Sequence, residues 1–144
     1  MKVKGRVHYV SPKGSAEMVA EAIAREMKVV KEPLLPAYMP EGIALMFLGC
    51  EGTKADKVTL SFISSLNSSR VANVALFCCN GKKSDAPIQQ MAAALKQQGV
   101  NVLPKTFVCN GKGGLFAGGK QPSDEELTVA RKFATECEQL VLGE

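Results

Sequence analysis

The apolar residues of this chain are concentrated in two nearly continuous runs. Residues 43–50 read IALMFLGC, and residues 71–81 read VANVALFCCNG. Short apolar runs that end in small residues are typical of strands buried on both faces, as in the middle of a parallel sheet. The pattern therefore predicts two central parallel strands, with helices covering both sides of the sheet.

Four other segments repeat apolar residues every three or four positions, the period of an amphipathic helix. The first runs from Ser15, the expected N-cap, to Met27, and the last begins at Ser123. Between them, residues 55–66 and 86–98 predict two further helices. The residues expected to face inward from the last helix are Leu127, Ala130, Phe133, Ala134, Cys137 and Leu140.

The remaining apolar segments complete a strict alternation of strand and helix. Residues 2–10 predict the first strand, residues 28–31 a short second one, and residues 100–111 a fifth, in which Pro104 indicates an edge position or a bulge. Alternation with short connections favours right-handed crossovers and a parallel sheet. We therefore predict an α/β fold, a three-layer sandwich with a five-stranded parallel sheet, formed by one domain over residues 1–144.

Composition and charge exclude several classes of function. Lys and Arg exceed Asp and Glu by 18 to 14, a net charge of +4, without the blocks of like charge that nucleic-acid or membrane-surface binding requires. No apolar run reaches the 18 or so residues that span a bilayer. The five cysteines are odd in number and no export signal precedes them, so we expect a cytoplasmic protein with free thiols.

The most informative polar segment is SPKGSA, residues 11–16, which joins the first strand to the first helix. The start of a helix offers unpaired N–H groups and the positive end of the helix dipole. Gly14 would let an anion approach the backbone, Ser11 and Ser15 offer hydroxyl donors, and Lys13 could add positive charge. The segment is therefore either a phosphate site or only a tight turn.

In a parallel sheet, ligands bind beyond the carboxyl ends of the strands, where the strand order reverses. The other loops expected there are GCEGTKAD (49–56), CCNGKKSD (78–85) and CNGKGGLFAGGKQPS (109–123). Other informative segments are MFLGC, VALFCCNG, LKQQGVNVLPKTFVCNGK and PSDEELTVARKFA. On the basis of these loops and segments, the chain resembles the flavodoxin family over nearly its whole length. The resemblance implies strand order 2-1-3-4-5 and a bound flavin mononucleotide (FMN).

The resemblance also assigns a set of candidate cofactor-binding residues. In the family, a Ser/Thr-x-Thr-Gly-Asn-Thr loop holds the phosphate, and the two following loops hold the flavin ring. Carried over to this chain, the candidates are Ser11, Pro12, Lys13, Gly14, Ser15, Ala16, Gly49, Cys50, Glu51, Gly52, Thr53, Cys79, Asn80, Gly81 and Lys82.

The chain departs from the family at both ends of the expected flavin. Lys13 and Ala16 stand where the family carries hydroxyl groups. The chain has no Trp, and neither ring loop contains an aromatic residue, so only Tyr38 and Met39 of the proline-rich crossing are left to reach the ring. We therefore expect weak FMN binding that is lost on purification.

Several conspicuous residues have simpler interpretations. Cys78 and Cys79 are adjacent, so they cannot form a C-x-x-C motif, and we expect one to pack inward and the other to face the loop. His8 is the only histidine and is expected to be structural, as are Cys109 and Cys137. The glycine-rich stretch 111–120 lacks the Gly-Lys-Ser/Thr of a nucleotide loop, which favours a mobile loop.

Two functions follow. The first is an FMN-binding electron-transfer protein or small flavin oxidoreductase, which needs no catalytic residues of its own because the cofactor carries the chemistry, and which would exchange electrons with a redox protein partner. The alternative is a flavodoxin-like domain without flavin, acting as an anion-binding or protein-interaction module. A third idea is thiol chemistry at Cys79, with Lys82 and Lys83 stabilising a thiolate.

Overall fold

The computed structural model describes residues 1–35, 37–111 and 122–143 of the chain. In these residues strands and helices alternate as the sequence pattern predicts. The elements in chain order are β1 (Gly5–Tyr9), α1 (Ser15–Met27), β2 (Lys31–Pro33), β3 (Ile43–Glu51), α2 (Lys57–Ser64), β4 (Val71–Cys79), α3 (Ala86–Gln97), β5 (Asn101–Cys109) and α4 (Asp124–Leu142).

The five strands form one sheet in the order β2-β1-β3-β4-β5, and every neighbouring pair is parallel. The predicted strand order is therefore confirmed. The two apolar runs form β3 and β4, which lie beside each other in the interior of the sheet. Since all strands point the same way, the loops that follow β1, β3 and β4 meet at one edge of the sheet.

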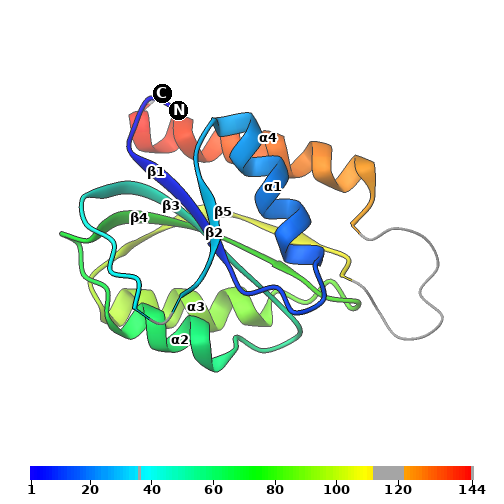
Figure 1. Cartoon of the computed structure of the whole chain (residues 1–144), viewed down its shortest axis with the longest axis horizontal. Helices are drawn as coiled ribbons and strands as arrows, with labels where there is room; N and C mark the ends of the chain where they lie inside the picture. The colour runs from blue at the N-terminus through cyan, green and yellow to red at the C-terminus, as the bar shows by residue number, and fades with distance from the viewer. Residues whose placement is uncertain (36, 112–121, 144) are drawn as a thin grey trace.

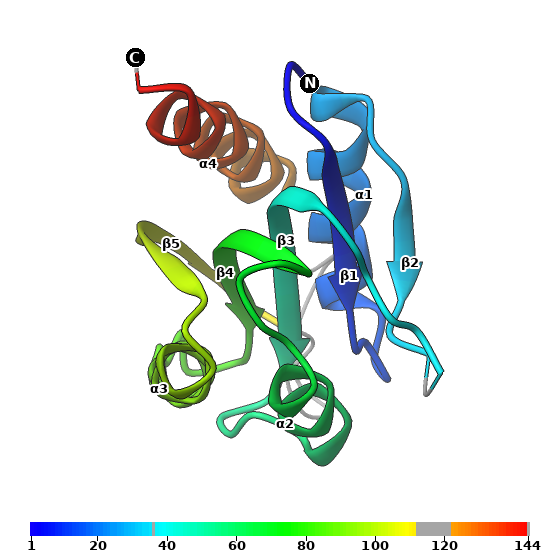
Figure 2. The same ribbon diagram turned by 90° about the vertical axis from the view of Figure 1, so that its left-hand side faces the viewer.

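Helices cover both faces of the sheet, which gives the predicted three layers (Figures 1 and 2). α1 and α4 lie side by side on one face, and α2 and α3 lie on the other. Alternate residues of each strand point to the two layers: Phe47 and Phe77 face α1 and α4, whereas Leu48 and Leu76 pack on the side of α2 and α3.

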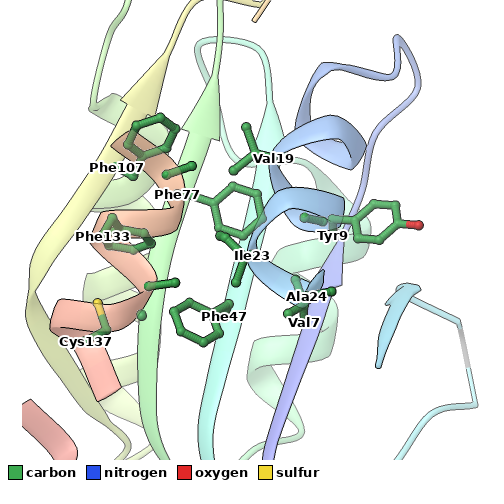
Figure 3. Close-up of a cluster of buried hydrophobic side chains, with 14 of the residues drawn as sticks. Val7, Tyr9, Val19, Ile23, Ala24, Phe47, Phe77, Phe107, Phe133 and Cys137 are labelled. Carbon is green, nitrogen blue, oxygen red and sulfur yellow. The ribbon is translucent and has the colours of Figure 1, made fainter. Parts of the chain in front are cut away.

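The core under α1 and α4 holds most of the large aromatic side chains (Figure 3). The ring of Phe133 from α4 packs edge-on against Phe47, with centroids 6.0 Å apart, and lies 5.9 Å from Phe107. Val19 and Ile23 fill the adjoining space from α1 and are fully buried. This packing fixes α1, and with it the loop that precedes α1, relative to the sheet.

The structure confirms the predicted start of the last helix and the irregularity predicted at Pro104. Ser123 caps α4, because its hydroxyl accepts a hydrogen bond from the Glu126 amide while the Glu126 carboxylate accepts one from the Ser123 amide. β5 is an edge strand, and its pairing with β4 shifts register between Val74 and Leu76, opposite the segment that contains Pro104. Proline lacks the N–H that a regular strand would donate there.

Three predictions about element ends and faces are wrong. The N-cap of α1 is Gly14, and Ser15 is the first helical residue. The second strand is Lys31–Pro33 and not 28–31, because Lys28 ends α1 in the left-handed conformation and the chain must turn before it can pair with β1. Leu140 is 43% exposed, whereas the next residue, Val141, packs against the core, so Leu140 lies on the outer side of the last turn of α4.

Other expectations concern single residues. Cys109 and Cys137 are fully buried in the core, and His8 is buried inside β1, as predicted. Among the described helices, none is both long and apolar enough to cross a membrane. The glycine-rich stretch 111–120 lies outside the described residues except for Gly111.

Candidate functional site

A pocket of about 370 Å³ lies between the loops that follow β1, β3 and β4. Ten of the sequence-predicted cofactor residues contribute to its lining. The full lining is Pro12, Lys13, Ser15, Glu51, Gly52, Thr53, Cys79, Asn80, Gly81, Lys82 and Gly111. Gly111, which comes shortly after β5, is the member that the sequence did not predict, and a Cβ added to it would lie only 3.1 Å from the backbone nitrogen of Asn80.

The other five predicted residues do not line this pocket. Ser11, Gly14 and Ala16 belong to the first loop, where two of them donate hydrogen bonds that are described below. Gly49 and Cys50 lie inside β3 and are fully buried, Gly49 against the ring of Phe77 and Cys50 in the core under α2 and α3.

The first loop surrounds a carboxylate from the same chain. Oε2 of Glu51 accepts hydrogen bonds from the Ser11 hydroxyl at 2.5 Å, the Ser15 hydroxyl at 2.9 Å and the Ala16 amide at 2.9 Å. Oε1 of Glu51 accepts one from the Lys13 amide at 2.8 Å. The residues chosen from the sequence as phosphate donors therefore converge on an anion, and that anion is the side chain of Glu51.

The helix start is satisfied by the same arrangement. The Ser11 hydroxyl donates to Glu51 and accepts from the Glu17 amide at 2.9 Å, and the Met18 amide donates to the Gly14 carbonyl. The Glu51 carboxylate thus accepts the kind of hydrogen bond that an N-cap side chain accepts, which Gly14 cannot do because it has no side chain. This explains why the true N-cap needs no polar side chain.

The environment of Glu51 determines its charge. Burial alone would raise its pKa, but the hydrogen bonds from Ser11, Ala16, Lys13 and Ser15 outweigh burial and hold the pKa below the ordinary value of 4.5. Each of these bonds is stronger to the ionised carboxylate than to the protonated acid. At neutral pH the loop therefore holds a full negative charge.

Gly14 is required by the backbone of this loop. Its φ is 91° and its ψ is −9°, a left-handed conformation that a β-branched residue adopts only under strain. We expect Gly14→Val to lower the free energy of unfolding by about 1–3 kcal/mol, and Gly14→Asn to cost less because Asn tolerates this region. Urea unfolding of both variants tests this, and equal losses would show that backbone strain is not the cause.

The loop after β4 is built around Asn80. Its side-chain amide donates to the Ser84 carbonyl at 2.8 Å, and its Oδ1 accepts from the amides of Ser84 at 2.8 Å and Lys82 at 3.2 Å. The Asn80 backbone amide also donates to the Cys109 carbonyl, which ties the loop to the end of β5. The side of the pocket formed by Gly81 and Lys82 therefore depends on one buried amide.

The cysteines near the pocket are not activated. Hydrogen bonding with Cys109 and burial both raise the pKa of the Cys79 thiol, and burial raises those of Cys50 and Cys78 to about 12. Cys78 and Cys79 are both buried, in the cores on opposite faces of the sheet. Cys78 packs inward as expected, and Cys79 lines the pocket between the loops although it is 1% exposed. A nucleophilic thiolate at Cys79 is disfavoured.

The two ends of an FMN molecule meet different conditions here. The donors of the first loop suit a phosphate, because they are already arranged around another anion, the Glu51 carboxylate. The ring loops offer backbone and small side chains but no aromatic face. Tyr38 and Met39 line a separate pocket of about 360 Å³ beside α2, where Tyr38 packs on His8 and Phe62. The site thus fits the phosphate and offers no stacking from these residues to the ring.

Comparison with solved structures agrees with the fold. An archaeal flavodoxin superposes with a TM-score of 0.73 at 18% identity, covering 96% of this chain and 98% of its own. A flavodoxin, WrbA-like protein from Agrobacterium tumefaciens gives 0.71 at 12% identity, with 99% of both chains covered. Flavodoxin 2 from Bacillus cereus gives 0.67 at 13% identity, covering 94% and 98%. No family model and no curated protein sequence matches the chain.

These likenesses, together with the strand order, define the class of protein. The chain is a flavodoxin-like domain in its fold, as the sequence predicted. Identities of 12–18% establish the architecture and leave the ligand to be argued from the residues of this chain.

Proposed function

We propose that this chain is an FMN-binding electron-transfer protein of the flavodoxin type, or a small flavin oxidoreductase, that binds its flavin weakly. The observation that carries the proposal is the four-donor loop at the start of α1, which already holds an anionic group. In this proposal the FMN phosphate takes the place of the Glu51 carboxylate and receives the same hydrogen bonds.

The remaining parts of the pocket would hold the rest of the cofactor. Gly52, Thr53, Asn80 and Gly81 present backbone and small polar groups toward the space beside the loop. Bound FMN supplies the redox chemistry, so no catalytic side chain is required. The protein would act in the cytoplasm and exchange electrons with a protein partner, and the net charge of +4 favours a partner with an acidic surface.

The proposal predicts weak binding in a direct titration. Each missing aromatic contact removes about 0.5–1.5 kcal/mol of stacking, which weakens binding by up to about tenfold. Quenching of FMN fluorescence by the purified protein should show saturable binding that does not survive gel filtration. A yellow, stoichiometric complex after gel filtration would contradict weak binding.

A second candidate function is the flavin-free module, and the same loop favours it. All four donors are used by Glu51, so the loop is satisfied without any ligand. A flat titration at high micromolar FMN would overturn the flavin proposal and leave an anion-binding or protein-interaction domain as the better account.

A further inference from the structure

We propose that Glu51 is an internal competitor for the anion site: its carboxylate fills the phosphate loop and must leave before any phosphate group can bind. The inference deepens the proposed function and rests on it only in assigning the loop to a phosphate. Its own evidence is the arrangement of donors, three on one carboxylate oxygen and one on the other.

The backbone of Glu51 is held, so only the side chain is free to move. Glu51 is the last residue of β3 and is paired in register with Cys79 of β4. The next residue, Gly52, donates its amide to the Cys79 carbonyl at 3.0 Å. The carboxylate therefore reaches the loop from a fixed point on the neighbouring strand, and leaving it requires rotation about side-chain bonds toward the open pocket.

The exchange of one anion for another explains why affinity should be low. The hydrogen bonds that a phosphate gains from Ser11, Lys13, Ser15 and Ala16 are the ones that Glu51 loses. The displaced carboxylate also stays tethered nearby, where its charge repels the phosphate. Only the difference between the two anions appears as binding free energy, so Glu51 sets both the affinity and the selectivity of the loop.

The isosteric variant Glu51→Gln separates this role from simple space-filling. A glutamine side chain has one acceptor oxygen, and its NH₂ group is a donor. It cannot serve the three donors on Oε2 and the Lys13 amide together, and it carries no charge. In Glu51→Gln, an external anion should therefore displace the glutamine side chain from the loop much more readily.

The test uses inorganic phosphate and sulfate as probes, without flavin. Binding is followed through the ¹H–¹⁵N NMR shifts of the Lys13 and Ala16 amides, with sodium chloride at equal ionic strength as a blank. We expect the dissociation constant for phosphate to fall at least tenfold in Glu51→Gln and in Glu51→Ala relative to the unaltered chain. Equal affinities in all three proteins would overturn the proposal.

A matched variant controls for the change in net charge. Glu26 is exposed near the far end of the same helix, so Glu26→Gln makes the same charge change away from the loop. Phosphate affinity in Glu26→Gln should equal that of the unaltered chain, and a gain as large as that of Glu51→Gln would overturn the proposal by assigning the effect to general electrostatics.

The outcomes for flavin and for Glu51 are separable. If FMN binds neither the unaltered chain nor any variant while phosphate binds Glu51→Gln tightly, the proposed flavin function fails and the role of Glu51 stands. If FMN binds the unaltered chain and phosphate affinity does not respond to Glu51, the role of Glu51 fails and the flavin function stands. Should Glu51→Ala fold poorly, Glu51→Gln decides the matter.

Discussion

Gly49→Ala is expected to destabilise the protein by about 3 kcal/mol, near the upper end for overpacking a core. A Cβ added at Gly49 would fall 2.0 Å from one carbon of the Phe77 ring and within 2.4 Å of two others. Gly49 and Phe77 are paired in register on β3 and β4, and the ring, which is fully buried, covers the glycine. The ring has no free space into which it could move, because the core is close-packed.

Urea unfolding with a matched glycine tests this cause. Gly5→Ala also adds a Cβ within a strand, but there the nearest atoms are the mobile end of Met1, so we expect only a small change. In the double variant Gly49→Ala with Phe77→Leu, the smaller side chain should relieve the clash, and the total loss should be clearly less than the sum of the two single losses. Additive losses would show that the Phe77 ring is not the obstacle.

Asn80→Ala is expected to lower the free energy of unfolding by about 2–3 kcal/mol, because it removes the three hydrogen bonds that the Asn80 side chain makes with the partly buried backbone of Ser84 and Lys82. The side chain of Asn80 is 5% exposed and makes three hydrogen bonds within its own loop. Unfolding in urea measures the loss, and hydrogen exchange at the Ser84 amide should speed up. In Lys82→Ala the backbone hydrogen bond to Asn80 remains, so this control should change stability by less than about 0.5 kcal/mol. Equal losses in the two variants would contradict the role assigned to Asn80.

Periodicity was sufficient for the fold because burial on two faces leaves a clear pattern. The runs at 43–50 and 71–81 became the central strands β3 and β4, and the helical spacing after Ser15 became α1. The short strand β2 was misplaced because its position depends on the left-handed turn at Lys28, and a lysine does not signal such a turn in sequence.

The sequence predicted which loops come together, and it did not predict the contact that Glu51 makes there. Topology brings the loops after β1, β3 and β4 together, so ten residues named from the sequence line one pocket. Glu51 was named as a cofactor residue because the sequence placed it in the loop after the third strand, and the structure makes it the last residue of β3. That it turns into a loop 36 residues away in sequence depends on the pairing of β1 with β3 and on side-chain rotation, and neither can be deduced from local pattern.

The charge state of Glu51 connects the site to stability. Its pKa in the folded protein lies below the ordinary 4.5, so the stability it contributes is present above about pH 4.5 and is lost as the pH falls through the folded value. In Glu51→Gln this part of the acid dependence should be absent.

The central claim is that the loop at residues 11–16 holds the ionised carboxylate of Glu51, and a ¹³C NMR titration of the side-chain carboxyl carbons tests it most directly. The account predicts that the Glu51 carboxyl titrates with a midpoint below 4.5 and that the amides of Lys13 and Ala16, which donate to it, shift with the same midpoint. A Glu51 carboxyl that titrates at its ordinary pKa, with no response from these two amides, would contradict it.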